Sequence, residues 1–265
     1  MPDPLDDFER TEFTHDGKTR TVYRQGRGPA VIVLSEMPGI TPRVADFARR
    51  LVGEGYTAVM PHLFGEPGKE PTMGYAMRSM GPACVSREFS ALATRQTRPV
   101  TVWLRALARS EHERCGGPGV GVVGMCFTGG FGLAMAVDDS VLAPVLSQPS
   151  VPFPFGKERK RDLGLSDDDL AVVKKRAADD DLCVMGLRFT GDKMSPPERF
   201  QRLHEELGDN FVGVEIDSSP GNPHGNPKMA HSVLTEHLVD EVGHPTRDAL
   251  GQVLELFSSR LLVKQ

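Results

Sequence analysis

Residues 120–136 read VGVVGMCFTGGFGLAMA, and this stretch decides the fold. Val120–Val123 is a branched apolar run typical of a buried strand, and a helix has to begin within a few residues of it. Cys126 stands at the bend between them, with glycines on both sides. Such a bend holds its apex residue in a strained backbone conformation, so small neighbours are needed. The stretch predicts a nucleophile elbow with cysteine in the position usual for serine.

The elbow would also prepare the cysteine for chemistry. The following helix points its positive N-terminal end at the sulfur, and this favours the thiolate, the form that attacks. The backbone N–H of Phe127 would lie ready to stabilise an oxyanion. The alternative interpretation is a structural cysteine beside a glycine patch that serves helix packing.

Strand and helix patterns alternate along the rest of the chain. Ala30–Leu34 and Tyr56–Pro61 are short apolar runs, and Val44–Val52 between them has apolar residues at helical spacing. Further strands are expected at Thr19–Arg24, Val120–Val123, Val141–Leu146, Leu182–Phe189 and Phe211–Ile216. Repeated units of strand and helix imply an α/β fold, with a mostly parallel sheet of about eight strands and helices on both faces.

We expect a single domain over residues 1–265, because α/β folds often reach this length undivided. The apolar stripe over residues 85–107 predicts one helix, which Pro99 kinks or divides. Two long connections, 62–83 and 148–181, are either exposed excursions or lids over a site.

Composition excludes several classes of partner. A net charge of −5 and a pI near 5.9 argue against binding to nucleic acid or to an anionic membrane. The acidic N-terminus has no signal-peptide pattern, and no apolar run is long enough to span a membrane. The four cysteines form no CxxC pair, which argues against disulfides and a zinc site. We expect a cytoplasmic protein with reduced thiols.

A cysteine nucleophile needs a base and an orienting acid, which follow it along the chain in this topology. Asp192 comes just after the strand expected at Leu182–Phe189, at a carboxyl end, where ligands bind in such sheets. Asp217 also ends a strand and is the main competitor. The alternative for Asp192 is a cap on the next helix.

The histidine should lie in the loop after the last strand, where the sequence offers three candidates. His224 sits in a turn of Gly, Asn and Pro, whereas His231 comes just before an apolar stretch. This position favours His231 as the base and leaves His224 as the alternative. His237 is typical of a helix or surface residue.

The residues as a group resemble the dienelactone hydrolases, which have the α/β-hydrolase fold and a Cys-His-Asp triad. The resemblance covers roughly Val31 to Leu262 and is strongest in VIVLSEMPGI, GYTAVMPHLFG, GMCFTGG, the Gly-Asp pair ending at Asp192, and AHSV from Ala230. It implies that Cys126 is the nucleophile, Asp192 the acid and His231 the base. It also implies that Glu36 interacts with the resting cysteine and shifts when substrate binds, and that the N–H of Met37 is the second oxyanion donor.

The sequence departs from the family pattern at two places in the site. Thr128 stands two residues after the nucleophile, where the family usually has glycine. Thr235 stands four residues after the histidine, where dienelactone enzymes carry an arginine for the substrate carboxylate. Arg78 or Arg87 could match the second arginine of the family.

The sequence therefore predicts a carboxylic ester or lactone hydrolase acting on a small molecule, without a metal or an organic cofactor, as a monomer or homodimer. Two alternatives remain open: a thioesterase or acyltransferase with the same triad, and a non-catalytic ligand-binding relative.

Overall fold

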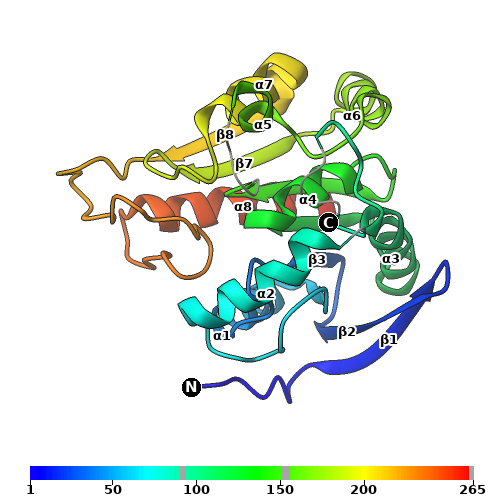
Figure 1. Cartoon of the computed structure of the whole chain (residues 1–265). Coiled ribbons are helices and arrows are strands. Elements are labelled where there is room, and N and C mark those ends of the chain that lie inside the picture. The colour runs from blue at the N-terminus through cyan, green and yellow to red at the C-terminus, as the bar shows by residue number, and fades with distance from the viewer. Residues whose placement is uncertain (87, 90–93, 151–155, 263–265) are drawn as a thin grey trace.

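One sheet organises the molecule, as the computed structural model shows (Figure 1). Across residues 1–86, 88–89, 94–150 and 156–262, which the structure describes, eight strands pair in the order β1-β2-β4-β3-β5-β6-β7-β8. The strands are β1 (Glu9–His15), β2 (Lys18–Gly26), β3 (Ala30–Leu34), β4 (Thr57–Pro61), β5 (Val120–Met125), β6 (Val141–Ser147), β7 (Val184–Phe189) and β8 (Phe211–Ile216).

The pairing from β4 to β8 is parallel, whereas β1 and β2 form an antiparallel edge. Every residue of β3, β4, β5 and β7 is buried, as expected of parallel strands that helices cover on both sides. The order and the direction of the strands confirm the predicted α/β fold with a mostly parallel sheet.

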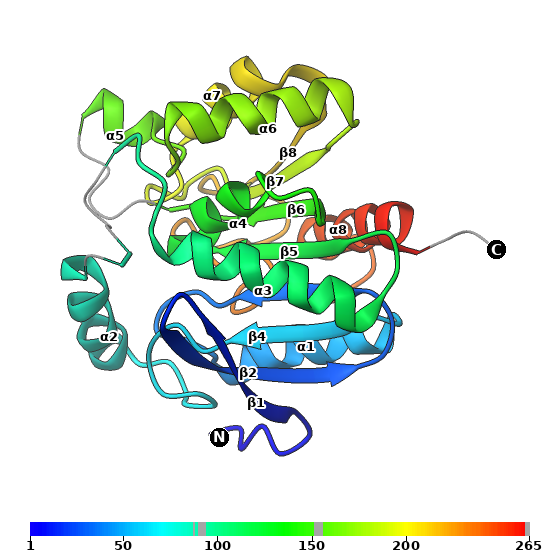
Figure 2. The ribbon, with the colours of Figure 1, turned by 90° about the vertical axis from the view of Figure 1, so that its right-hand side faces the viewer.

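Helices cover the sheet from both faces (Figure 2). Ile32 of β3 points into the core beneath α3 (Val100–Cys115), α4 (Gly129–Met135), α6 (Asp167–Asp179) and α7 (Pro197–Leu207). Its neighbours Val31 and Val33 point into the core beneath α1 (Pro42–Gly53) and α8 (Pro245–Leu261). The alternation follows from strand geometry, because successive side chains leave a strand on opposite sides.

Strand β1 is an element that the sequence pattern did not reveal. Its residues are exposed or only partly buried, so an apolar alternation is weak there. Phe13 still anchors the strand, with its ring 5.3 Å from the ring of Trp103 on α3 in an edge-on contact.

The helix predicted over 85–107 is confirmed only from Val100 onward, and the break that was expected at Pro99 is present. Helix α2 (Met73–Val85) ends where that prediction began, and α3 starts at Val100 with Pro99 at its N-cap. Proline lacks the N–H that a helix interior requires, but it is tolerated at a helix start. Residues 87 and 90–93 lie outside the described part of the chain. Phe89 is buried and stacks on Phe131, with ring centroids 6.1 Å apart.

The two long connections carry helices of their own. Helix α2 starts inside 62–83, and 148–181 contains α5 (Lys157–Arg161) and α6. Helix α6 belongs to the body of the molecule, because Leu170, Val173 and Ala177 are buried in the core. Helices α2 and α5 lie beyond the carboxyl ends of the parallel strands (Figure 2), so a lid role for these segments stays a prediction. Among the described residues, no helix combines the length and the apolar character that crossing a membrane requires.

Candidate active site

Cys126 lies at the apex of a sharp turn between β5 and α4. Its φ is +54°, in the left-handed region that side chains other than glycine seldom adopt. The turn depends on glycine at two neighbours. A Cβ on Gly124 would lie 2.4 Å from the carbonyl oxygen of Thr128, and one on Gly129 would lie 2.6 Å from Pro149. The strand-to-helix bend is therefore the predicted elbow geometry.

Thr128 is fully buried and holds this turn together. Its hydroxyl oxygen accepts the N–H of Met125 at 2.9 Å and lies 2.9 Å from both the Met125 and the Leu34 carbonyl oxygens, which compete for its single proton. Leu34 is the last residue of β3, just before the loop that carries Glu36 and Met37. The hydroxyl therefore fastens the elbow to that loop, which a glycine could not do.

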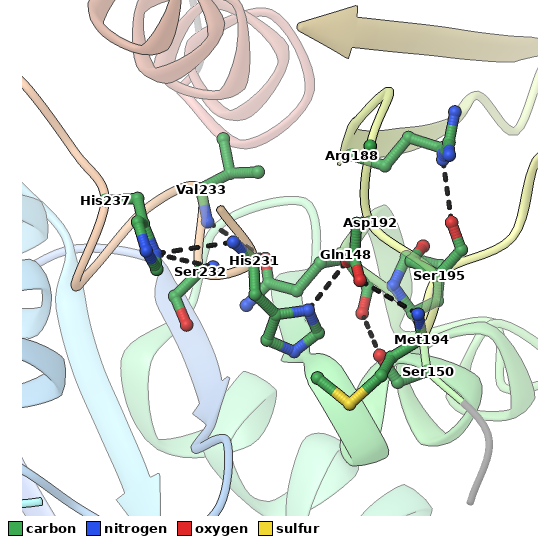
Figure 3. A network of polar contacts seen from close by, with 12 residues as sticks. Gln148, Ser150, Arg188, Asp192, Met194, Ser195, His231, Ser232, Val233 and His237 are labelled. Carbon is green, nitrogen blue, oxygen red and sulfur yellow. Dashed lines mark hydrogen bonds and ion pairs between the residues drawn. The ribbon is translucent and has the colours of Figure 1, made fainter. Parts of the chain in front are cut away.

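Asp192, in the loop after β7, and His231, in the loop after β8, point toward one another (Figure 3). The Asp192 carboxylate oxygen Oδ2 lies 2.6 Å from Nδ1 of His231. The other carboxylate oxygen accepts the N–H of Met194 at 2.9 Å, and the backbone N–H of Asp192 donates to Phe189 at the end of β7. Asp192 is buried, so this bond fixes the tilt of the imidazole away from water.

Charge around His231 changes its proton affinity. Burial lowers the pKa of His231, whereas the negative charge of Cys126 and the hydrogen bond to Asp192 raise it. The raising effects prevail, so the pKa of His231 lies well above its ordinary value. The second ring nitrogen, Nε2, is buried and makes no hydrogen bond within the described part of the chain. The electrostatics thus couple His231 to Cys126 on one side and to Asp192 on the other.

Glu36 is buried at the end of β3 and ties three loops together. Its carboxylate accepts hydrogen bonds from Ser232 at 2.5 Å, from Gln148 at 3.2 Å and from Thr235. Ser232 and Thr235 belong to the loop that carries His231. The resemblance implied an interaction of Glu36 with the cysteine; in this structure the hydrogen bonds of the carboxylate go to the histidine loop and to Gln148.

Two residues of the site escaped sequence reasoning. Gln148, next after β6, accepts the N–H of Val233 through Oε1 at 3.2 Å. His237 accepts the N–H of Ser232 at 3.2 Å and of His231 at 3.4 Å through Nδ1 (Figure 3). It is half-buried in a turn and is not the helix or surface residue that the sequence suggested. Its position six residues after His231, within one loop, was the available signal.

The remaining candidates from the sequence are Asp217, His224, Arg78 and Arg87. Asp217 and His224 are exposed. A hydrogen bond from the Ser219 N–H is the main cause that lowers the pKa of Asp217. Arg78 is exposed on α2, and Arg87 falls outside the described residues. Within the described part of the chain, no group of three or more His, Cys, Asp or Glu side chains could hold a metal ion.

Comparison with known proteins agrees with the fold. No curated protein matches the sequence. A putative dienelactone hydrolase from Klebsiella pneumoniae is 17% identical, with a TM-score of 0.62 over 95% of this chain and 98% of that chain. A dienelactone hydrolase-like promiscuous phosphotriesterase from metagenomic libraries is 15% identical, with a TM-score of 0.61 over 96% and 98%. An esterase from Pyrococcus furiosus is 14% identical, with a TM-score of 0.59 over 96% and 92%.

These likenesses to solved structures establish the α/β-hydrolase fold. The sequence adds a more specific match, because residues 18–261 fit the dienelactone hydrolase family and span all of the strands except β1. The chain therefore belongs to the dienelactone hydrolase family.

Proposed function

We propose that the protein hydrolyses a carboxylic ester or lactone bond of a small molecule, with Cys126 as nucleophile, His231 as base and Asp192 as the acid that orients the base. The reaction needs no metal or organic cofactor. Membership of the dienelactone hydrolase family supports a hydrolase activity in general. The arrangement of these three side chains supports the role proposed for each.

The reaction starts from the Cys126–His231 pair. His231 takes the thiol proton, and the thiolate forms a bond to the carbonyl carbon of the substrate. The tetrahedral intermediate collapses to a thioester while His231 gives its proton to the departing alkoxide. A water molecule then loses a proton to His231 and attacks the thioester, and the proton returns to the Cys126 sulfur as the acid leaves. In a lactone the alkoxide stays attached, so one product is released.

Two backbone amides would stabilise the intermediate. Phe127 follows Cys126 at the start of the 3₁₀ turn (Cys126–Thr128), and Met37 lies in the loop that Thr128 fastens to the elbow. Their N–H groups would donate to the oxyanion, an interaction worth about 2.7–4 kcal/mol per donor in comparable enzymes. We propose that Glu36 acts beside them by holding the loop of His231 through Ser232 and Thr235.

One observation carries the proposal. The Asp192–His231 bond of 2.6 Å fixes an imidazole that is electrostatically coupled to the strained, left-handed Cys126. A structural cysteine would need neither the strained turn nor an oriented, buried imidazole beside it.

The test is hydrolysis of p-nitrophenyl acetate and of a small lactone by the full chain and its variants. We expect Cys126→Ser and His231→Ala each to lower kcat/KM on the order of 10³-fold or more, and Asp192→Asn on the order of 10³–10⁴-fold. Asp217→Asn and His224→Ala are matched controls, since they alter the exposed competitors, and both should keep wild-type rates. A loss in these controls with wild-type rates in Asp192→Asn and His231→Ala would refute the assignment.

A further inference from the structure

A small cavity lies behind the elbow, on the side of α7. Its volume is about 10 Å³, roughly the room needed by one water molecule or small ion. The turn after Cys126 forms one wall through Phe127 and Gly130, and Arg98 and Arg199 also line the cavity. Ser150 links the cavity to the nucleophile, because its N–H donates to the carbonyl oxygen of Cys126 at 2.9 Å.

Arg199 is almost completely buried at the start of α7, at 3% exposure, and its hydrogen bonding is incomplete. Nη1 donates to the carbonyl oxygen of Pro149 at 2.7 Å, but Nε and Nη2 are buried and find no acceptor among the residues that the structure describes. Arg188 offers a contrast within the same protein. It is just as buried, yet its three nitrogens donate to Ser195, Glu215 and Thr190. Buried donors are normally paired, so nitrogens that are unpaired within the described part of the chain indicate room for a bound ligand.

The charge around the cavity is also unbalanced. Arg98 and Asp162 are buried and form an ion pair, with Nη2 and Oδ2 separated by 3.8 Å. Two guanidinium groups and one carboxylate leave a net charge of +1. Burial lowers the pKa of Arg199 to about 10, so this group stays protonated at neutral pH. Residues 151–155, which follow Ser150, include no charged side chain and cannot supply a carboxylate.

We propose that this cavity binds one small monovalent anion, of the size of chloride or formate, on the free N–H groups of Arg199, with Arg98 adding its charge. A neutral water could satisfy two N–H groups, but it would leave the buried positive charge uncompensated, and a buried charge without a counter-charge is costly. The anion would stabilise the turn after Cys126, because Phe127 and Gly130 of that turn line the same cavity. The site uses none of the proposed triad, so the Cys126→Ser variant should keep it.

The experiment follows the melting temperature of the full chain as sodium chloride, sodium formate or sodium benzoate is added at constant ionic strength. A ligand that binds only the folded state raises the melting temperature in a saturable way. We expect a saturable rise of about 2–6 °C with chloride and formate. Benzoate is too large for the cavity and should give no saturable rise. A crystal soaked in bromide should show anomalous density beside Arg199.

Arg199→Met should abolish the chloride-dependent rise, whereas Arg202→Met, one turn along the same helix, should keep it. If Arg199→Met does not fold, Arg98→Met is used instead and should weaken the chloride-dependent rise. The comparison of chloride with benzoate can also be made on the wild type alone. A melting temperature that does not respond to chloride would overturn the proposal in favour of a buried water. Bromide density without a saturable response would indicate an adventitious ion only, and would overturn it as well.

Discussion

The hydroxyl oxygen of Thr128 lies 2.9 Å from the carbonyl oxygen of Leu34, and this contact joins the turn of Cys126 to the end of β3. The same oxygen accepts the N–H of Met125, one residue before Cys126. Thr128 thus couples the turn of Cys126 with the loop of Glu36 and Met37.

Replacing Thr128 with valine should test this coupling. Valine has nearly the same shape but leaves the buried N–H of Met125 without its acceptor. We expect a loss of about 1–3 kcal/mol in the free energy of unfolding, measured by urea denaturation, together with a lower kcat. Thr128→Ser keeps the hydroxyl and should keep most of the stability. Equal stability of the valine and serine variants would show that the hydrogen bonds contribute nothing.

Alkylation with iodoacetamide should select Cys126 over Cys115 and Cys183. Burial raises the pKa of the Cys115 thiol and of the Cys183 thiol, which keeps both in the unreactive protonated form. Cys126 is coupled electrostatically to His231, which takes the thiol proton in the proposed mechanism. We expect its alkylation to be on the order of 10-fold faster than that of Cys115 or Cys183 at neutral pH.

Mass spectrometry of tryptic peptides would measure the rate at each of these cysteines. His231→Ala is the informative variant, because it should remove the advantage of Cys126, while the exposed His224→Ala should not. Faster labelling of Cys115 than of Cys126 in the wild type would contradict a nucleophile at position 126.

The sheet could be predicted from the sequence because its inner strands are buried on both faces and read as unbroken apolar runs. Strand β1 lacked that signal, since water covers much of it. The helix predicted over 85–107 was confirmed only from Val100 onward, for a different reason. Phe89 is buried and packs on Phe127 and Phe131, but it does not belong to a helix. The spacing of apolar residues indicates which residues are buried, and it does not distinguish a helix residue from a loop residue that packs on the same core.

The candidate triad could be predicted because chain order and strand ends limit where each residue can lie. The contacts of Glu36 could not. They join residues almost two hundred positions apart, Glu36 to Ser232 and Thr235, and no local pattern encodes such a pair. Thr235 illustrates the difference: the sequence showed only that an arginine was missing, and the structure shows a hydroxyl bound to the Glu36 carboxylate.

The pKa of His231 should depend on Cys126. The charge of Cys126 is the largest of the effects that raise the pKa of His231, ahead of the hydrogen bond to Asp192. Cys126→Ser removes that charge and leaves burial, which lowers the pKa. We therefore expect the pKa of His231 to fall in Cys126→Ser, as followed by the imidazole resonances in NMR titration. Cys115→Ser is the control and should leave the titration unchanged. An unchanged pKa in Cys126→Ser would mean that the two groups are not coupled.

His237 should make the histidine loop sensitive to acid. Burial and the positive charge of His231 lower the pKa of His237 below its ordinary value of 6.5, so the ring is neutral in the fold and Nδ1 can accept the N–H groups of His231 and Ser232. His237 therefore binds a proton more readily in the unfolded chain than in the folded one. The contribution of His237 to stability is therefore present above pH 6.5 and is lost as the pH falls below it.

Asparagine at position 237 keeps an acceptor at the place of Nδ1 but cannot be protonated. We expect His237→Asn to match the wild type near neutral pH in stability and kcat, and to lose less of both in acid. His237→Ala removes the acceptor and should lower kcat at every pH with a smaller change in KM, because the His231 backbone is no longer held. His204→Asn, an exposed histidine on α7, should follow the wild type. The measurements are urea denaturation and kcat across the acid range, and a His237→Asn profile identical to that of the wild type would show that His237 does not carry the acid response.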